Sequence, residues 1–139
     1  MTPTKDVMEY QRIWVEGLNR GDLATADKIF AKDCLIHITG QPEPLRGPEQ
    51  WKQFLSVFLT AFPDIKFVME DQVVQGDKVA HRWTCTGTHT GPLGPVPPTG
   101  KKATINGLVI DRLVNGKVQE RWELYDNAAL MQQLGLVPG

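Results

Sequence analysis

The spacing of apolar residues along the chain changes at Pro63, from a helical period to a period of two. Before Pro63, apolar side chains recur every three or four residues, as in Val7, Tyr10, Trp14 and Leu18. This spacing is typical of amphipathic helices. The first half therefore predicts helices over about 6–20, 22–30 and 48–62, a short strand over 34–38, and a loop over 40–47.

After Pro63 apolar and polar residues alternate, which is typical of strands with one buried face. The pair Asn115-Gly116 suits a type I′ hairpin turn, because both central residues of that turn need a positive φ. Helices followed by antiparallel strands predict an α+β fold, in one domain over 1–139. The second half predicts strands over 65–70, 79–90, 104–114 and 117–125, a turn over 75–78, a proline-rich loop over 91–100, and a helix over 127–134.

Composition narrows the class of protein without pointing to a reaction. The chain has 139 residues, 41% hydrophobic and 22% charged, with a formal net charge of −1. Near-neutral charge argues against a nucleic-acid or anionic-membrane partner. The N-terminus has no apolar signal segment and no run is long enough to span a membrane, so we expect a cytoplasmic protein. Cys34 and Cys85 fall in apolar runs outside any CxxC motif; buried free thiols are the main expectation, and a disulfide the alternative.

The strand before the last helix ends on a carboxylate. Five of its residues share one parity, so a regular strand would direct them to the same face. The apolar members predict that this face is the interior, which would place Asp126 at the rim of a pocket. A carboxylate there is costly without partners or a chemical task. The five residues are Val118, Glu120, Trp122, Leu124 and Asp126.

These features resemble the SnoaL-like polyketide cyclases of the NTF2-like superfamily. The resemblance covers about 22–135 and implies a cone, in which a curved antiparallel sheet wraps around N-terminal helices, and a homodimer formed through the outer sheet face. It rests on Trp122, Asp126 and the run Leu130, Gln133, Leu134, Gly135, and on the segments Leu45-Arg46-Gly47, Ala61-Phe62-Pro63-Asp64, Gly76-Asp77-Lys78-Val79, Arg82-Trp83-Thr84, Thr86-Gly87-Thr88-His89 and Pro97-Pro98-Thr99-Gly100.

The resemblance implies that Asp126 is the acid/base of an intramolecular aldol closure. That chemistry removes a proton beside a carbonyl group and returns one to an oxygen, which a carboxyl with a raised pKa can do. Trp122 is expected to bind the substrate body. The structural alternative is that Asp126 caps the helix that follows it.

Arg82 and His37 are the other candidates for substrate contacts. Arg82 is expected either to hold Asp126 or a substrate oxygen, or to form a surface ion pair. The epoxide hydrolases of the superfamily have an Arg-x-Asp pair on this strand, and Thr84 replaces that Asp here. His37 is expected either at the cavity mouth as a proton carrier or as a structural residue.

Two residues that are typical of other enzymes in the superfamily are missing from this sequence. Ketosteroid isomerases place a carboxylate base near His37, but this chain has no acid between Asp33 and Glu43. Cyclases of the family can pair the late Asp with a His on the preceding strand, and no His lies between Thr104 and Val114.

No metal or cofactor is expected. His81 and His89 are eight residues apart on one predicted strand, roughly 26 Å at about 3.3 Å per residue, too far to share an ion. No HExxH, GxGxxG or phosphate-binding loop occurs. The leading hypothesis is a cofactor-free cyclase for a small apolar or carbonyl-containing ligand. The alternatives are an isomerase or epoxide hydrolase using the same pocket, and a non-catalytic binding or dimerisation module.

Overall fold

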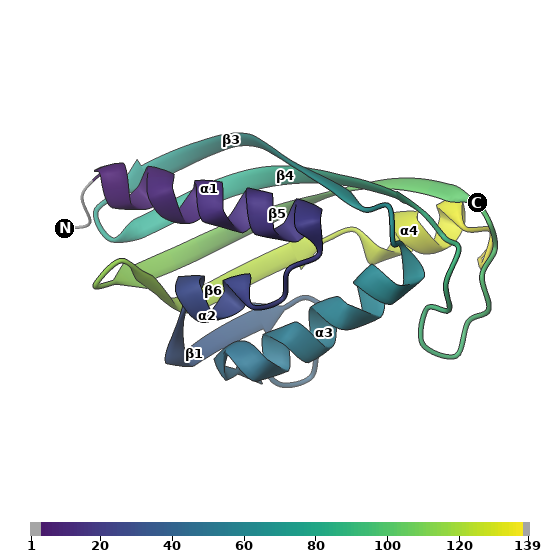
Figure 1. Cartoon of the computed structure of the whole chain (residues 1–139), viewed down its shortest axis with the longest axis horizontal. Helices are drawn as coiled ribbons and strands as arrows, with labels where there is room; N and C mark the ends of the chain where they lie inside the picture. Colours follow the sequence, from purple (N-terminus) through teal and green to yellow (C-terminus); the bar gives the residue numbers. More distant parts are fainter. Residues whose placement is uncertain (1–3, 138–139) are drawn as a thin grey trace.

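The protein folds into helices packed inside a curved sheet (Figure 1). The computed structural model describes residues 4–137. Within them the chain forms four helices and six strands. In chain order these are α1 (Thr4–Arg20), α2 (Thr25–Ile29), β1 (Phe30–Ile38), β2 (Leu45–Arg46), α3 (Gly47–Ala61), β3 (Lys66–Gln75), β4 (Lys78–Thr88), β5 (Lys102–Val114), β6 (Lys117–Tyr125) and α4 (Asn127–Gln133).

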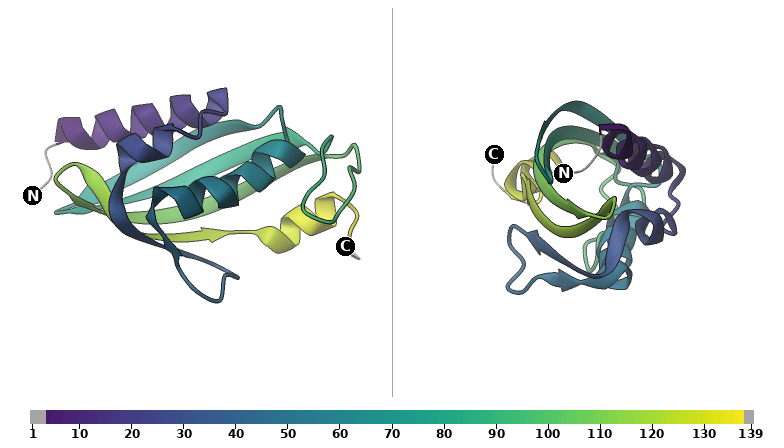
Figure 2. Two further views of the ribbon diagram at one scale, coloured as in Figure 1. Left: turned by 60° about the horizontal axis from the view of Figure 1, so that its bottom comes forward. Right: turned by 90° about the vertical axis from the view of Figure 1, so that its left-hand side faces the viewer.

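The six strands form one sheet in the order β2-β1-β6-β5-β4-β3. The sheet curls without closing, and α1, α2 and α3 cover its concave side (Figure 2). Helix α4 follows β6 and lies at one end of the sheet, beside the loop that joins β4 to β5 (Figure 1). This arrangement confirms the α+β class and the NTF2-like cone.

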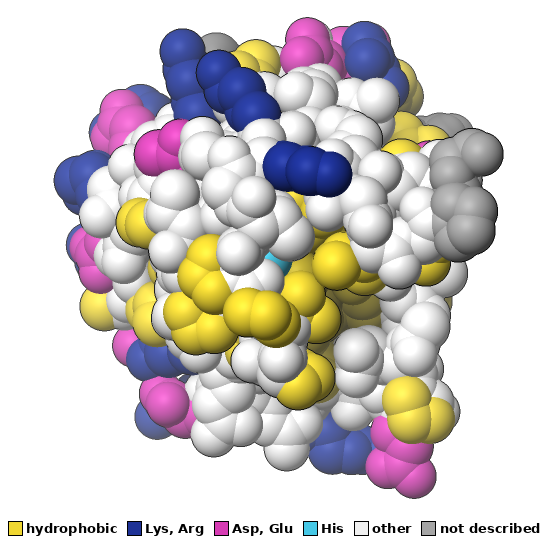
Figure 3. Space-filling model, turned by 90° about the vertical axis from the view of Figure 1, so that its right-hand side faces the viewer, with side chains coloured by type: hydrophobic (Ala, Val, Ile, Leu, Met, Phe, Trp, Pro, Cys, Tyr) yellow, Lys and Arg dark blue, Asp and Glu magenta, His cyan; other side chains and the backbone are white. Residues whose placement is uncertain are grey.

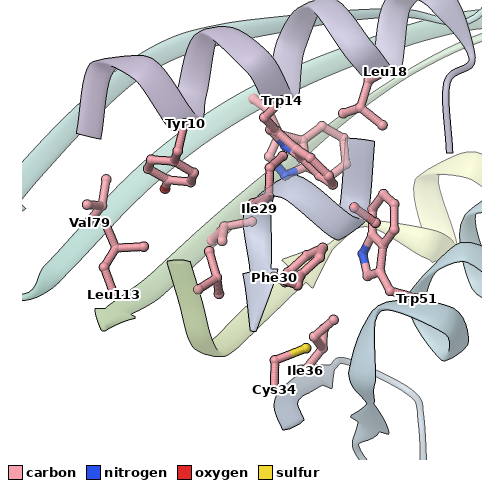
Figure 4. Close-up of a cluster of buried hydrophobic side chains, with 14 of the residues drawn as sticks. Tyr10, Trp14, Leu18, Ile29, Phe30, Cys34, Ile36, Trp51, Val79 and Leu113 are labelled. Carbon is pink, nitrogen blue, oxygen red and sulfur yellow. The ribbon is translucent and has the colours of Figure 1, made fainter. Parts of the chain in front are cut away.

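The core lies between the concave face and the helices, as the close-up in Figure 4 shows. Trp14 of α1 packs against Trp51 of α3 with ring centroids 4.6 Å apart, and it forms a T-shaped pair with Phe30 with centroids 5.8 Å apart. Apolar residues at helical spacing on α1 and α3 therefore face the alternating inward residues of β1, among them Cys34 and Ile36. Their burial supplies the hydrophobic driving force of the fold.

Three details differ from the sequence-based expectation. Phe30 begins β1 instead of ending α2, and the short strand β2 lies inside the loop expected over 40–47. The pairing of β1 with β6 is parallel, whereas the other neighbouring pairs are antiparallel. A strand that returns after the whole β3–β5 meander can pair in parallel, since the long connection removes the constraint of a hairpin turn.

A β-bulge in β6 reverses the direction of its side chains. Leu113 pairs with Val118, but the preceding residue Arg112 pairs with Glu120, so β6 contains one extra residue. A single extra residue moves every later side chain to the opposite face. Val118 and Arg121 are both buried, although their parities differ.

The prediction that Val118, Trp122 and Leu124 share an interior face is therefore wrong beyond Val118. Trp122 is 38% exposed and Leu124 58% exposed, both on the outer face of the sheet. The side chains that point inward after the bulge have odd numbers, among them Arg121 and Glu123.

Candidate functional site

An apolar cavity lies inside the cone, between the sheet and helices α1 and α3. Its volume is about 100 Å³. Figure 3, which faces the end of the molecule that carries α4, shows a hollow surrounded by hydrophobic side chains. Aromatic rings form much of the wall, including those of Trp14, Trp51, Phe54, Phe58, Phe67 and Trp83. The wall suits a flat, apolar ligand, because aromatic rings favour stacked and edge-to-face contacts.

One carboxyl group, that of Glu123, enters this apolar wall. Its side chain is only 15% exposed. Burial raises the pKa of Glu123 above its usual range; Arg121 opposes the rise and the charge of Asp111 adds to it. Burial destabilises the charged form of the carboxyl. The carboxylate is therefore a stronger base than one in water and takes up a proton more readily.

Three further polar side chains line the cavity. The phenol of Tyr125 has a pKa raised by burial and by the nearby charge of Glu123, so it remains a hydrogen-bond donor. Its ring meets that of Phe58 edge-on at 6.1 Å. Thr86 contributes a hydroxyl, and burial raises the pKa of the Cys85 thiol to about 12. Cys85 therefore stays protonated and is a poor nucleophile.

A buried ion pair lies beside Glu123. Arg121 donates from Nε to Oδ1 of Asp111 at 2.6 Å and from Nη2 to Oδ2 at 2.9 Å. Its guanidinium carbon lies 4.8 Å from the centre of the Trp14 ring and 5.0 Å from that of Phe30. Nη1 of Arg121 is 3.6 Å from Oε1 of Glu123.

Asp111 has two more partners, from different elements. The Tyr10 hydroxyl donates to Oδ2 at 2.9 Å, and Nε2 of His81 lies 3.3 Å from the same oxygen. Burial would raise the pKa of Asp111, but the charge of Arg121 and the bonds from His81 and Arg121 hold it well below its usual range. Asp111 is therefore a fixed negative charge inside the protein.

His37 and Trp122, two residues expected at the pocket, lie together on the outer face of the sheet. Their rings stack with centroids 5.5 Å apart. Nε2 of His37 is 2.7 Å from Oε2 of Glu120. This contact lowers the pKa of Glu120, and neither ring is part of the cavity wall.

Arg82 and Asp126 also lie outside the cavity. Both border a shallow depression on the outer face, together with Asn106, Leu108 and Leu124. Arg82 forms an ion pair with Asp71 at 3.1 Å, and Oδ1 of Asp126 accepts a bond from the backbone N–H of Ala129 at 2.9 Å. Asp126 is thus the N-cap of α4, as the structural alternative predicted.

Glu123 and Tyr125 were not predicted as site residues, because the bulge in β6 changes which side chains face inward. The remaining signal was a second parity set in β6, in which Arg121, Glu123 and Tyr125 alternate with Trp122 and Leu124. If β6 can contain a bulge, the sequence alone does not indicate which of the two sets faces the interior.

The structure gives no support for a metal centre in the part of the chain that it describes. No group of three or more His, Cys, Asp or Glu side chains with metal-binding geometry occurs there. Cys34 and Cys85 are both free thiols, the first buried and the second half-buried. No helix within residues 4–137 is long and apolar enough to cross a membrane.

Comparisons with known proteins identify a family and solved structures of the same fold. The family model described as SnoaL-like polyketide cyclase matches residues 8–134. IdmH from Streptomyces antibioticus, a "putative polyketide cyclase", is 32% identical, with 92% of this chain and 97% of that chain covered and a TM-score of 0.81. AclR from Streptomyces galilaeus, a "putative hydroxylase", is 27% identical, with coverage of 95% and 88% and a TM-score of 0.82.

A third structure supports the fold alone. TsrD from Streptomyces laurentii has a TM-score of 0.88 at 23% identity, with 99% of this chain and 100% of that chain covered. A search of curated proteins gave no match.

Proposed function

Because the chain belongs to the SnoaL-like polyketide cyclase family, we propose that it catalyses the aldol-type ring closure of a polyketide-like compound with an enolisable carbonyl group. The observation that carries this proposal is a single carboxyl, Glu123, in a cavity whose wall is mainly apolar and aromatic. The wall holds the substrate body, and the carboxyl supplies the proton transfers.

In the proposed reaction Glu123 acts first as a base and then as an acid. Its carboxylate removes a proton from the carbon beside a carbonyl group, which leaves an enolate. The enolate carbon then forms a bond to a second carbonyl carbon of the same molecule. The oxygen of that second carbonyl takes the proton back from Glu123, so the enzyme returns to its starting state.

Tyr125 is proposed to assist by hydrogen bonding to the developing enolate oxygen. Its hydroxyl shares the cavity with Glu123, and its raised pKa keeps the proton on the phenol. A preorganised donor in a site with little water stabilises charge that appears only in the transition state.

Asp126 remains a competing proposal for the acid/base, based on the resemblance. Against it stand its place outside the cavity and its bond to Ala129. The two carboxyls are three residues apart, so one matched pair of substitutions separates them.

The test replaces each carboxyl with its amide. We expect Glu123→Gln to lower kcat by about 10²- to 10⁴-fold, the usual contribution of a general acid/base. Asp126→Asn should stay near wild type, since an Asn also caps helices well. Turnover of candidate poly-ketone substrates is measured for both, with circular dichroism as the check on folding. The reverse ranking would transfer the role to Asp126.

A non-catalytic binding module is the second candidate, favoured by the scarcity of polar groups in the wall. Under that hypothesis a planar apolar ligand binds equally well to wild type and Glu123→Gln. No poly-ketone is then turned over by either protein.

A further inference from the structure

Arg121 lies next to Glu123 but makes its hydrogen bonds with Asp111. Two of its nitrogens donate to Asp111 at 2.6 and 2.9 Å, whereas Nη1 is 3.6 Å from Glu123, beyond hydrogen-bond length. A guanidinium that fully paired with Glu123 would favour the carboxylate and make it a weak base. Arg121 is therefore hydrogen-bonded to Asp111, and its contact with Glu123 is a longer ion pair at 3.6 Å.

Asp111 is held in place from three other elements of the fold. Arg121 of β6, Tyr10 of α1 and His81 of β4 all bond to its carboxylate, and all of these side chains are buried. Replacement of a buried ion pair by apolar residues is often neutral or stabilising, so stability alone is a weak reason for such a pair. A role at the neighbouring cavity is a better explanation.

Few other charges act on Glu123. Asp111 of β5 and Arg121 and Tyr125 of β6 are its titratable neighbours, and Cys85 of β4 lines the same cavity. The cavity-lining side chains of α1 and α3 are all apolar or tryptophan, so neither helix adds a charge. Apart from burial, the charges of Arg121 and Asp111 are therefore the main influences on the titration of Glu123.

We propose that Asp111 is a positioning residue: it holds the guanidinium of Arg121 so that the contact with Glu123 stays at 3.6 Å, longer than a hydrogen bond, and Glu123 remains able to accept and return a proton. This inference rests on the proposed function of Glu123. It extends that function to a residue that lies outside the cavity wall and cannot touch the substrate.

Loss of the Asp111 charge should favour the carboxylate form of Glu123 in two ways. The freed Arg121 would turn its guanidinium toward Glu123, and the negative charge that disfavours a second anion would be gone. Both changes move the titration midpoint of Glu123 to lower pH. Each unit of that movement lowers the protonated fraction above the midpoint about tenfold.

The experiment follows the side-chain carboxyl carbon of Glu123 by NMR as pH changes, with Glu123→Gln to assign the signal. Asp111→Asn should shift the midpoint down. Tyr10→Phe is the matched control, because it removes one bond to Asp111 but leaves Arg121 paired; its midpoint should equal that of wild type. The double variant Asp111→Asn/Arg121→Gln should return the midpoint to the wild-type value or above it.

Each result decides the proposal without any substrate. A wild-type midpoint in Asp111→Asn, or a downward shift of equal size in Tyr10→Phe, would overturn it. If Asp111→Asn does not fold, the double variant is decisive, since a midpoint below wild type in the absence of both charges contradicts the proposed role of Arg121. Turnover by Glu123→Gln separately tests the catalytic proposal, so the two can fail independently.

Discussion

Two carboxyl groups three residues apart have opposite environments. Glu123 lies among aromatic rings, where burial raises its pKa, and Asp126 lies on the surface, where it caps α4. The chemistry available to each follows from its surroundings, because desolvation penalises the charged form and a backbone N–H bond stabilises it. Glu123 is suited to proton transfer and Asp126 to holding a helix.

The raised pKa of Glu123 predicts a pH-dependent cost in stability. An acid whose pKa is higher in the folded protein binds protons more tightly there than when unfolded. Folded Glu123 therefore does not destabilise the protein below the unfolded pKa of about 4.3; the destabilisation grows as pH rises from there to the folded pKa and is constant above it.

The measurement compares wild type with Glu123→Gln by urea unfolding at several pH values. We expect the free energy of unfolding of the variant to increase relative to that of wild type as pH rises above about 4.3, the reference pKa of Glu, and the difference to become constant above the folded pKa. A difference that stays constant at every pH measured would show that Glu123 titrates as it does in the unfolded chain.

At the scale of elements, hydrophobic periodicity predicted most of the architecture. The stripes on α1 and α3 and the alternation in β4 and β5 are local patterns, so they could be read without the tertiary structure. The Asn115-Gly116 turn was also readable, and both residues have a positive φ, of 53° and 77°. These signals predict which helices and strands form, but they do not determine the pairing register of the strands.

The site was predicted less well, because its position depends on one extra residue in β6. A bulge is decided by pairing between strands, here Leu113 with Val118 and Arg112 with Glu120. A reading of β6 alone assigned Trp122 to the interior, and the pairing places it outside. The sequence shows the residue types of the site, but it does not show which face of the sheet they lie on.

Gly107 of β5 lies beside Trp83, whose ring lines the cavity. It pairs with Trp83, and a Cβ built on it would lie 2.1 Å from Cζ2 of that ring. Gly107→Ala must therefore displace the Trp83 ring, which is part of the cavity wall. We expect a loss of about 1–3 kcal/mol in urea unfolding, the usual cost of overpacking, and weaker binding of planar ligands. A variant as stable as wild type would show that the ring moves without cost.

At the scale of the whole molecule, the sheet has two apolar faces. The concave face packs on helices and encloses the cavity. The outer face carries an apolar ladder of directly paired residues, Leu108 with Leu124 and Ile110 with Trp122, and none of the four is buried. An apolar patch of this kind on a sheet usually marks an interface between proteins.

We therefore propose that two copies pair through this ladder, as the family resemblance implies. Leu124→Glu places a charge in the proposed interface and should raise the dimer Kd by at least about 30-fold, which corresponds to roughly 2 kcal/mol, the size of a hot-spot effect. Val57→Glu is the matched control, because Val57 is also exposed but lies on α3. Sedimentation equilibrium of wild type and both variants measures the association. A wild-type protein that stays monomeric, or a control that dissociates as readily as Leu124→Glu, would contradict the ladder as the interface.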